Sequence, residues 1–566
     1  MRRTLARLSA RIAPDAPSAA SSSTPSFARP DTPATRPPRA QYGQALPHSH
    51  PHLFPRTLPF PAPPPLSLSL SGASAPAQAD VAHEQLTPGI PAAEYAERRS
   101  RLMQSLPEGS AVLVMAARIK CMSGNINYRF RQDSNFWYLT GWQEPDAALL
   151  LESAPSSAKG YKMTMFVSPR DSVSELWNGP RNGIDGAMDV FGADQAFAMD
   201  PVALQAYLKT LLSSTSHFYL DLPSSPSFPR RSRSSSSSST SSGNLLTYLT
   251  PSASSLDVFS KKSDFDALVK LLNDSKRTRA LAPFVEKLRL VKSRHELGVM
   301  RKAGAIGSKG MREVMRFAEV GRSEGQVQAT FEHLTSLHGA QRPAYVPVVA
   351  SGLNALTIHY IANESLLHAN DLVCIDAGPE VDGYVSDITR VFPVSSRFSS
   401  AQKDLYSAVL RVLKQCTSLA TAQNGYTQGE LHRRSVELLR VELERLGFNL
   451  RSGMLERLYP HSLSHWLGID LHDTPTIERG TRLQEGHVLT IEPAVYVPQG
   501  DDAFPKAFWG MGIRIEDDVA VGYDSNVVLS AEAPREVEDV EAACAGWEEG
   551  VEIVKREVSE QMRRTQ

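Results

Sequence analysis

One hairpin-like stretch constrains the fold of this chain more than any other feature. Two apolar runs, Leu372–Asp376 and Tyr384–Phe392, flank turn-forming glycine, proline and aspartate residues, which is typical of a β-hairpin. A two-residue turn centred on 381–382 sets Asp376 directly opposite Asp387 on one face of the ribbon. Two carboxylates at cross-strand distance repel each other unless a cation lies between them. The hairpin therefore predicts a metal site, and the alternative is that one or both aspartates point to solvent.

A second group of candidate ligands lies in the histidine-rich segment 461–473, HSLSHWLGIDLHD. His461 and His465 are four residues apart, which is also the spacing of a helical zinc pair, but Ser462 stands where the H-E-x-x-H motif has glutamate. His472 follows seven residues later. Neutral imidazole binds metals and transfers protons, although any one of these histidines alone is more often structural.

Two glutamates complete the candidate set. Glu492 closes the apolar run 488–491, and Glu516 follows Arg514 at the spacing of one strand face. A charged residue among buried apolar ones needs a partner or a metal. Two aspartates, one histidine and two glutamates form an oxygen-rich set, which suits a pair of hard or borderline divalent ions better than a thiolate zinc site.

Length and composition limit what kind of protein carries these residues. A chain of 566 residues is too long for one ordinary hydrophobic core, so at least two domains are expected. No apolar run is long enough for a transmembrane helix, and the four cysteines show no metal-binding or redox spacing. A formal net charge of −1 gives no reason to expect a nucleic-acid partner.

The first 79 residues differ in composition from the rest. They contain eight arginines, no lysine and two acidic residues, together with 16 of the 39 prolines, so they cannot bury enough apolar surface to fold. Arg3, Arg7 and Arg11 recur every four residues at the start. An Arg-rich, Ser-rich, acid-poor amphipathic start predicts a mitochondrial transit peptide, and the alternative is a disordered basic tail.

The remaining sequence predicts two folded domains. Residues 88–283 favour an α/β domain, interrupted by a Ser-rich insertion at about 223–243. Residues 284–545 favour an α+β domain that opens with a capping box, and a charged tail covers 546–566.

We expect particular elements in each domain. In the first, a helix precedes three buried strands; in the second, helices alternate with strands. The expected strands of the first domain are 111–115, 147–151 and 163–167. In the second domain, the first helix starts at Ser293/Glu296, and further helices cover 322–337, 400–421 and 428–446. The expected strands of the second domain are 372–376, 384–392, 488–492 and 513–519.

Five motifs in this order resemble the "pita-bread" metallopeptidases, and among them the Xaa-Pro aminopeptidases (aminopeptidase P). The motifs are TIHY (357–360), DAG…SDITR (376–390), HSLSHWLG (461–468), IEP (491–493) and GIRIEDD (512–518). Two segments of the first half, 130–145 and 175–183, resemble the non-catalytic N-terminal domain of the same enzymes. The resemblance implies a pita-bread catalytic domain preceded by a smaller α/β domain.

The resemblance also implies roles for individual residues. The two metals would be held by Asp376, Asp387, His465, Glu492 and Glu516, with Glu492 as general base; His359, His461 and His472 would surround the substrate, and Arg514 would lie beside the last glutamate. Manganese is favoured by ligand hardness, with cobalt or zinc as substitutes. The substrate would be the N-terminus of a peptide or protein, cut at its first bond.

Together with the Arg-rich start, the resemblance points to mitochondrial members that trim one residue after presequence removal, in the matrix or at the inner-membrane periphery. Ser462 and Ala494 replace glycines common in the family, which puts a strict proline requirement in doubt. The aromatic residues Phe136, Trp137, Tyr138 and Trp142 form either part of the pocket for the first substrate residue or core of the N-terminal domain. A prolidase-type dipeptidase, a metal-free creatinase-like enzyme and a catalytically inactive peptide-binding module remain alternatives, and the sequence leaves a homo-oligomer open.

Overall fold

The computed structural model describes residues 43–54, 85–221 and 277–546, apart from the single positions 48, 125 and 452. The predicted helix carrying Arg3, Arg7 and Arg11, the Ser-rich insertion at 223–243 and the tail beyond 546 lie outside the described residues. All described residues belong to one compact unit. Its mixture of helices and strands confirms the predicted α+β class.

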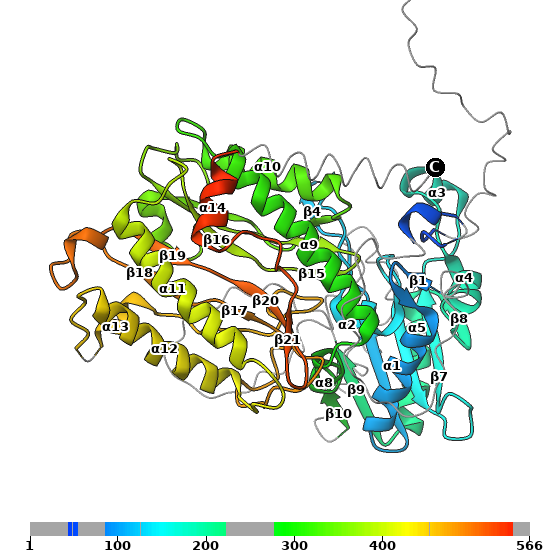
Figure 1. Ribbon diagram of the computed structural model, residues 1–566. Helices are drawn as coiled ribbons and strands as arrows, with labels where there is room; N and C mark the ends of the chain where they lie inside the picture. Colours follow the sequence, from blue (N-terminus) through cyan, green and yellow to red (C-terminus); the bar gives the residue numbers. More distant parts are fainter. Residues whose placement is uncertain are drawn as a thin grey trace, which may run out of the picture. The chain divides into compact units, whose positions relative to one another are not determined.

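The N-terminal half is built on a six-stranded mixed sheet with helices on both faces (Figure 1). Alternate residues of β3 point to opposite faces: Val112 and Val114 pack in a core with α1, whereas Ala111 and Leu113 pack with α5. In the order of the sheet, the strands are β10 (Thr278–Ala280), β9 (His217–Asp221), β3 (Ser110–Met115), β6 (Ala148–Ser153), β7 (Tyr161–Val167) and β8 (Gln195–Ala198). The three strands predicted for this half are confirmed as β3, β6 and β7.

The helices of this half are mostly short. The longer two, α1 and α5, are the ones that cover the sheet. Their bounds are α1 (Ala92–Ser105), α2 (Ser134–Thr140), α3 (Ser172–Asn178), α4 (Gly183–Asp189), α5 (Pro201–Ser214) and α8 (Ala282–Leu290). Small two-stranded ribbons, β1 (Gln85–Thr87) with β2 (Ile90–Pro91) and β4 (Cys121–Ser123) with β5 (Ile126–Asn127), complete it.

The aromatic residues of and after α2 belong to the core. Phe136, Trp137, Tyr138 and Trp142 are each at most 3% exposed and share one hydrophobic cluster. Trp137 stands edge-on to Tyr384 of the catalytic half, with ring centroids 5.5 Å apart. The idea that these side chains line a substrate pocket is therefore wrong, because their apolar surface is used to join the two halves.

A short piece of the Pro-rich N-terminal segment is packed against the N-terminal half. Leu46 and Phe54 are 6% and 3% exposed, and the Gln44 side chain donates to the Leu86 carbonyl at 3.1 Å. Gly43 lies against Pro180, where a Cβ atom would be 2.2 Å from the carbonyl oxygen. The expectation that residues 1–79 contribute nothing to a core is wrong for this piece, because two large apolar side chains in a polar segment suffice to anchor it.

The catalytic half carries two pairs of long helices, and each begins at a capping box as the sequence predicted for the first of them. These helices are α9 (Arg294–Phe317), α10 (Glu324–Leu337), α11 (Ser400–Leu419) and α12 (Gln428–Arg445), which confirms the four expected helices. Helices α9 and α10 pack against each other, as do α11 and α12, drawn in yellow tones in Figure 1. Shorter helices α13 (Met454–Leu458) and α14 (Val537–Cys544) follow.

Short strands form several small antiparallel sheets between these helices. The first sheet has the order β12-β13-β16 and the second β11-β14-β15; β17-β20-β21 and β18-β19 form the other two. Their bounds are β11 (Arg342–Pro343), β12 (Val348–Ser351), β13 (Leu372–Asp376), β14 (Pro379–Val381), β15 (Tyr384–Val385), β16 (Thr389–Pro393), β17 (Val488–Ile491), β18 (Ala494–Tyr496), β19 (Gly512–Arg514), β20 (Asp517–Val521) and β21 (Asn526–Val528).

Two predicted strands are interrupted. The strand expected at 384–392 is β15 and β16, separated by residues 386–388, and the one expected at 513–519 is β19 and β20, separated by 515–516. In both cases the chain leaves one sheet and joins another. Apolar periodicity continues through both gaps and therefore does not indicate the change of partner strand.

The hairpin register also differs from the prediction. Val381 pairs with Tyr384, so the turn is formed by Asp382 and Gly383, whose φ angles are +50° and +88°. A type I′ turn needs positive φ at both central residues, which Asp-Gly tolerates and β-branched Val381 does not. Asp376 consequently lies opposite Thr389 and not opposite Asp387. The two aspartates stay on the same face, because the shift is two residues.

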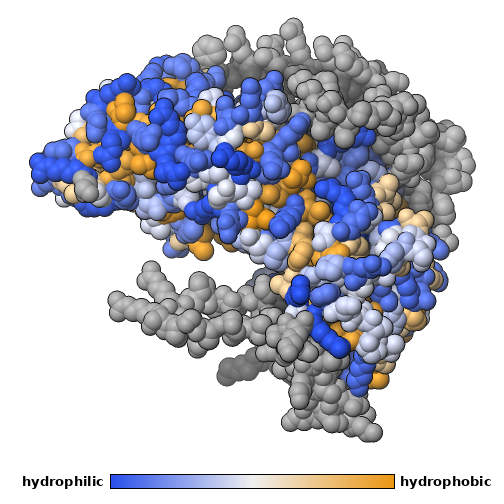
Figure 2. All heavy atoms as spheres, turned by 90° about the horizontal axis from the view of Figure 1, so that it is seen from below, coloured by the Kyte–Doolittle hydropathy of each residue, from blue (hydrophilic) through white to orange (hydrophobic). Residues whose placement is uncertain are grey.

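None of the helices in the described ranges combines the length and apolar character that a membrane span requires. On the face shown in Figure 2, hydrophobic side chains lie in small groups between hydrophilic ones.

Candidate metal centre

The two hairpin aspartates converge on one hydroxyl group. Tyr345, just before β12, lies with its OH 2.5 Å from Asp376 Oδ1 and 2.5 Å from Asp387 Oδ1. Asp387 can approach the opposite strand because the residue facing it, Gly378, has no side chain. A Cβ atom on Gly378 would lie 1.7 Å from the Ser386 carbonyl oxygen. Any larger residue at 378 would force the two strands apart. Both predicted aspartates therefore border one site.

Glu516 and Arg514 approach the same site from the gap between β19 and β20. The Thr389 hydroxyl donates to Glu516 Oε2 at 2.6 Å and accepts from Arg514 Nε at 3.2 Å. Arg514 Nη2 also donates to Asp376 Oδ2 at 2.6 Å. Arg514 is buried, so its charge offsets part of the negative charge collected here.

His465 offers its outer nitrogen to the site. Its Nδ1 lies 3.0 Å from the Trp466 carbonyl oxygen, which only accepts, so Nδ1 carries the proton. Nε2 then faces the site, 3.2 Å from Asp387 Oδ2, and a cation that displaces its proton would find its lone pair there. A backbone carbonyl that fixes the tautomer in this way is the usual support of a metal-binding histidine. Asp387, His465 and Glu516 each place a ligand atom within 4.8 Å of the others.

Glu492 lies at the border of this cluster, directly after β17. Its amide donates to the Leu463 carbonyl at 2.8 Å, and its carboxylate oxygens are 3.9 Å from His465 Nε2 and 3.7 Å from His461 Nδ1. The predicted carboxylates and His465 are thus brought together, although the backbone segments that carry them are far apart in sequence.

The pKa values of the carboxylates are typical of a site that binds cations. Burial, together with the neighbouring Asp387, holds the pKa of Glu516 well above its usual range, and burial raises the pKa of Glu492 to about 7. Burial and the Asp376 charge also raise the pKa of Asp387. Burial opposes protonation of His465, but Asp387 outweighs it and raises the pKa of that imidazole to about 9. Divalent cations would relieve this repulsion, so the donor set fits metal ions.

The other three predicted histidines take different positions. The His461 Nδ1 donates to the Ser462 carbonyl at 2.9 Å, so its Nε2 accepts from Tyr496 OH at 3.2 Å. The His472 ring stands edge-on to His465, with centroids 4.5 Å apart. Burial lowers the pKa of His461 and of His472 to about 4, so both are neutral at physiological pH. His359 is exposed, and its charge lowers the pKa of His472 further.

Sequence reasoning missed several residues that support the site. Tyr345 and Tyr496 lie in segments without any chemical motif, and only the fold brings the Tyr345 hydroxyl to Asp376 and Asp387 and the Tyr496 hydroxyl to Arg514. Asp518 was detectable, because three consecutive acidic residues in an apolar strand call for buried partners. Its carboxylate accepts from the Asp387 amide at 3.0 Å and from the Ser386 hydroxyl at 2.6 Å, which fixes the backbone at Asp387.

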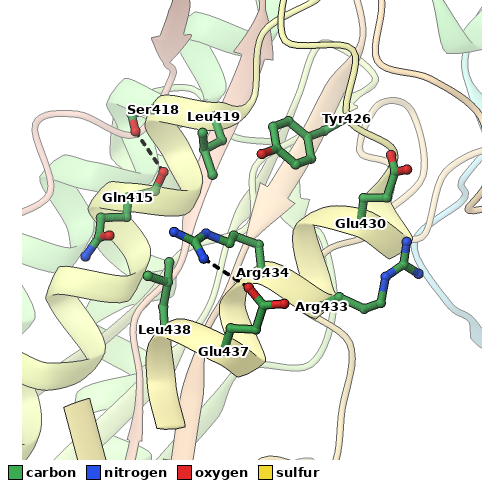
Figure 3. A pocket seen from close by; sticks show the side chains of 9 residues that line it. All are labelled: Gln415, Ser418, Leu419, Tyr426, Glu430, Arg433, Arg434, Glu437 and Leu438. Carbon is green, nitrogen blue, oxygen red and sulfur yellow. Dashed lines mark hydrogen bonds and ion pairs between the residues drawn. The ribbon is translucent and has the colours of Figure 1, made fainter. Parts of the chain in front are cut away.

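The open pocket between α11 and α12 is separate from this centre. Figure 3 shows its wall, where Arg434 pairs with Glu437 at 3.0 Å and Tyr426 faces the space between the helices. Its volume is about 510 Å³, and none of the predicted site residues lines it. The chemistry belongs to the carboxylate cluster and not to this cleft.

Comparison with known proteins places this geometry in a family. Residues 298–522 match metallopeptidase family M24, and residues 95–219 match the N-terminal domain of aminopeptidase P. Intermediate cleaving peptidase 55 of Saccharomyces cerevisiae is 37% identical over 463 residues, covering 81% of this chain and 85% of that protein. The chain belongs to metallopeptidase family M24. This membership confirms the resemblance inferred from the five motifs, the pita-bread fold with its smaller N-terminal domain, and the assignment as a peptidase.

Other M24 peptidases are similar over most of their length. Human Xaa-Pro aminopeptidase 3 is 33% identical, covering 91% of this chain and 92% of that protein. The crystal structure of yeast Icp55 lacking its N-terminal 58 residues superposes with a TM-score of 0.70 at 33% identity, covering 82% of this chain and 100% of that one. Zinc-substituted Escherichia coli aminopeptidase P in complex with product gives a TM-score of 0.68 at 29% identity, covering 81% and 98%. M24 metallopeptidases use divalent metals, and the Asp387–His465–Glu516 cluster is this chain's candidate for holding them.

Proposed function

We propose that this M24 enzyme is a dinuclear metalloaminopeptidase that removes a single N-terminal residue from polypeptides. The observation that carries the proposal is the convergence of Asp387, His465 and Glu516 within 4.8 Å, bordered by Asp376 and Glu492. Four carboxylates and one imidazole suit two hard or borderline ions, of which Mn²⁺ is favoured. Such ions, when bound, supply an activated water molecule and polarise the scissile carbonyl.

Glu492 is the proposed general base. A base works best when its pKa lies near the working pH, and burial raises the pKa of this carboxyl to about 7 in the metal-free protein. Its position 3.7 Å from His461 and 3.9 Å from His465 leaves its oxygens next to the ligand atoms without a strong hydrogen bond to either histidine. Glu492 can therefore accept the proton of the attacking water and pass it to the leaving amine.

Glu492→Gln tests this role. The amide retains an oxygen for coordination but cannot accept a proton, so turnover should fall by about 10²–10⁴-fold while at least one metal ion remains bound. Turnover and metal content are measured on the same sample. Normal turnover in this variant would remove Glu492 from the mechanism.

Neutral His472 is proposed to contact the polarised carbonyl oxygen of the substrate. Its pKa is lowered to about 4, so the ring donates one hydrogen bond without charge. His461, whose Nδ1 proton is already donated to the Ser462 carbonyl, would border the substrate and hold Tyr496. His359, exposed beside His472, would meet the residue after the cut. Arg514 holds Asp376 by a 2.6 Å ion pair, next to which the free amino group of the substrate would sit. This arrangement would confine cleavage to the first bond.

The natural role proposed here is trimming of imported mitochondrial proteins after presequence removal. Support comes from relatives named intermediate cleaving peptidase 55, one of them, from Arabidopsis thaliana, described as mitochondrial, at 32% identity over 88% of this chain. The Arg-rich start of the sequence agrees with import. Comparison of protein N-termini in mitochondria with and without this enzyme would reveal which residue it removes. Import of a protein lacking residues 1–42 would show that the targeting signal lies elsewhere.

A strict Xaa-Pro aminopeptidase is the second candidate, because the human relative carries that name. A matched peptide pair, Tyr-Ser-(x)n and Ala-Pro-(x)n, separates the two activities by product mass. The trimming enzyme should release tyrosine from the first peptide, whereas cleavage of the Ala-Pro peptide alone would support the proline-specific enzyme. A dipeptide such as Ala-Pro distinguishes both from a prolidase, which would cleave it.

A further inference from the structure

We infer that Arg131, in the non-catalytic N-terminal half, is a positioning residue for His472. The inference rests on the proposed function of His472 and concerns how its loop is held. Arg131 donates to two different segments of the catalytic half at once. Its guanidinium therefore joins the loop that carries His472 to the hairpin that leads to Asp387.

The hydrogen bonds of Arg131 have a defined geometry. Nε lies 2.7 Å from Glu380 Oε2 on β14, and Nη2 lies 2.8 Å from the Ile469 carbonyl oxygen and 3.2 Å from Asp470 Oδ1. The planar fork of arginine presents these donors at fixed angles, which lysine cannot reproduce. Glu380 pairs with Val385 in the hairpin, two residues before Asp387. One side chain thus fixes the spacing between the two segments.

The loop has further anchors on its other side. Ser134 Oγ donates to Asp470 Oδ1 at 2.6 Å, and Arg289 donates to Asp470 Oδ2 at 2.7 Å and also to Asp473. Lys292 Nζ lies 3.2 Å from Asp473 Oδ2. Asp470 and Asp473 flank His472, so the backbone on both sides of this histidine is held from outside.

His472 depends on these anchors because its own ring has few contacts. Among the described residues, the ring packs edge-on against His465, and no hydrogen bond holds its nitrogens. The His472 side chain is exposed on one part and desolvated by its neighbours on the rest, so packing alone does not fix the ring. Its orientation towards the site therefore follows from the position of the loop backbone.

Arg131 does not act chiefly through stability. Its side chain is 37% exposed, and its buried partner Glu380 keeps a second arginine, Arg342, 3.5 Å away, so the loss of this ion pair should cost little free energy of folding. A loop displaced by a fraction of an ångström, by contrast, changes the rate of a reaction that needs aligned groups. Loss of Arg131 should consequently lower activity much more than it lowers the melting temperature.

A double-mutant cycle with His472→Ala tests the inference. Arg131→Met should lower kcat/KM by about 5- to 20-fold, with metal content and melting temperature unchanged. In the His472→Ala background the same change should alter kcat/KM by less than about twofold, because the group it positions is gone. Arg129→Met, an exposed arginine two residues away, is the matched control and should match the wild type.

Additive losses in the two backgrounds would overturn the inference, as would full activity of Arg131→Met. If Arg131→Met does not fold, Ser134→Ala removes one hydrogen bond to the same loop and should show a smaller loss, about 2- to 5-fold, that also vanishes with His472→Ala. Undiminished activity of Ser134→Ala, or a loss that persists without His472, would overturn it equally. A wild-type protein without peptidase activity would instead contradict the proposed function.

Discussion

The ladders of the six-stranded sheet in the N-terminal half differ from those of the small sheets around the candidate metal centre. In the first, β3 and β6 pair without interruption over five residues and bear no site residue. In the second, the site carboxylates stand where a ladder stops: Asp376 ends β13, Asp387 lies between β15 and β16, Glu492 follows β17, and Glu516 lies between β19 and β20. A side chain in a regular strand must alternate between two faces. Breaks in the ladders allow these carboxylates to converge, so the site is formed where the sheets are irregular.

Removal of one ligand should break the function of the second region while sparing its fold. Asp387→Ala or Glu516→Ala should reduce turnover to background and lower metal content, because each takes an anionic ligand from a paired site. The melting temperature of the metal-free protein should not fall, since burial and the repulsion between the carboxylates raise the pKa of both groups, so that their charges do not stabilise the fold. Calorimetry and metal analysis check both points. An active, fully metallated Asp387→Ala protein would refute the ligand assignment.

A core substitution in the first region should do the opposite. Leu150 in β6 is fully buried, and Leu150→Ala should lower the free energy of unfolding by about 2–5 kcal/mol through the cavity it leaves. Turnover per folded molecule should stay near the wild-type value. Denaturant unfolding with an activity assay on the folded fraction measures both. A strong loss of turnover in folded Leu150→Ala would mean that the two regions are coupled through the sheet.

The contact between the two regions should make the free energy of unfolding depend on pH. Glu94 of α1 binds Arg98 at 2.6 Å, His295 at 2.7 Å and the Ser293 hydroxyl at the start of α9 at 2.8 Å. Burial opposes the charge, but these partners outweigh it and lower the pKa of Glu94 to about 2. A lowered pKa stabilises the fold above the ordinary pKa near 4.5, and this contribution is lost as the pH falls towards 2.

Glu94→Gln should therefore lower the free energy of unfolding by on the order of 2–3 kcal/mol at pH 7 and by about half as much at pH 3. Urea titrations at the two pH values measure the difference. Glu97→Gln on the exposed side of α1 is the control and should have no such pH dependence. Equal losses at both pH values would exclude the charge of Glu94 as the cause.

The smallest effect is expected from the docked N-terminal piece. Deletion of residues 1–42 should leave the melting temperature unchanged, whereas deletion of 1–54 removes buried Leu46 and Phe54 and should cost about 1–2 kcal/mol. Thermal unfolding of the two truncated proteins provides the comparison. Identical melting temperatures would show that the packing of this piece contributes no net stability.

Prediction from sequence succeeded where local chemistry decides the outcome. Ser293 and Glu296 mark the start of α9 because a capping box is a local signal, and the buried runs of β3, β6 and β7 are rich in apolar residues. The segments that the structure brings together at the candidate metal centre were also recognisable, through their motifs and their resemblance to a family. The hairpin register was predicted wrongly although a local signal for it exists, since Asp382-Gly383 is the pair that a type I′ turn favours.

Prediction failed where the outcome depends on contacts distant in sequence. Tyr345 reaches Asp376 and Asp387 only because β12 pairs with β13. The breaks at Asp387 and Glu516 reflect a change of partner strand, which no periodicity within the segment records. Trp137 likewise joins the two halves and does not line a pocket because it contacts Tyr384, which lies almost 250 residues later in the sequence.

The proposed ligands lie in separate segments of the chain, which determines when during synthesis the site can form. The proposed donors run from Asp376 to Glu516, and the last of them lies within 51 residues of the final residue, Gln566. A polypeptide is made from its N-terminus onward, so a partly made chain holds an incomplete site until Glu516 has been added. The proposed catalytic site is therefore complete only after the whole catalytic half has been synthesised and has folded.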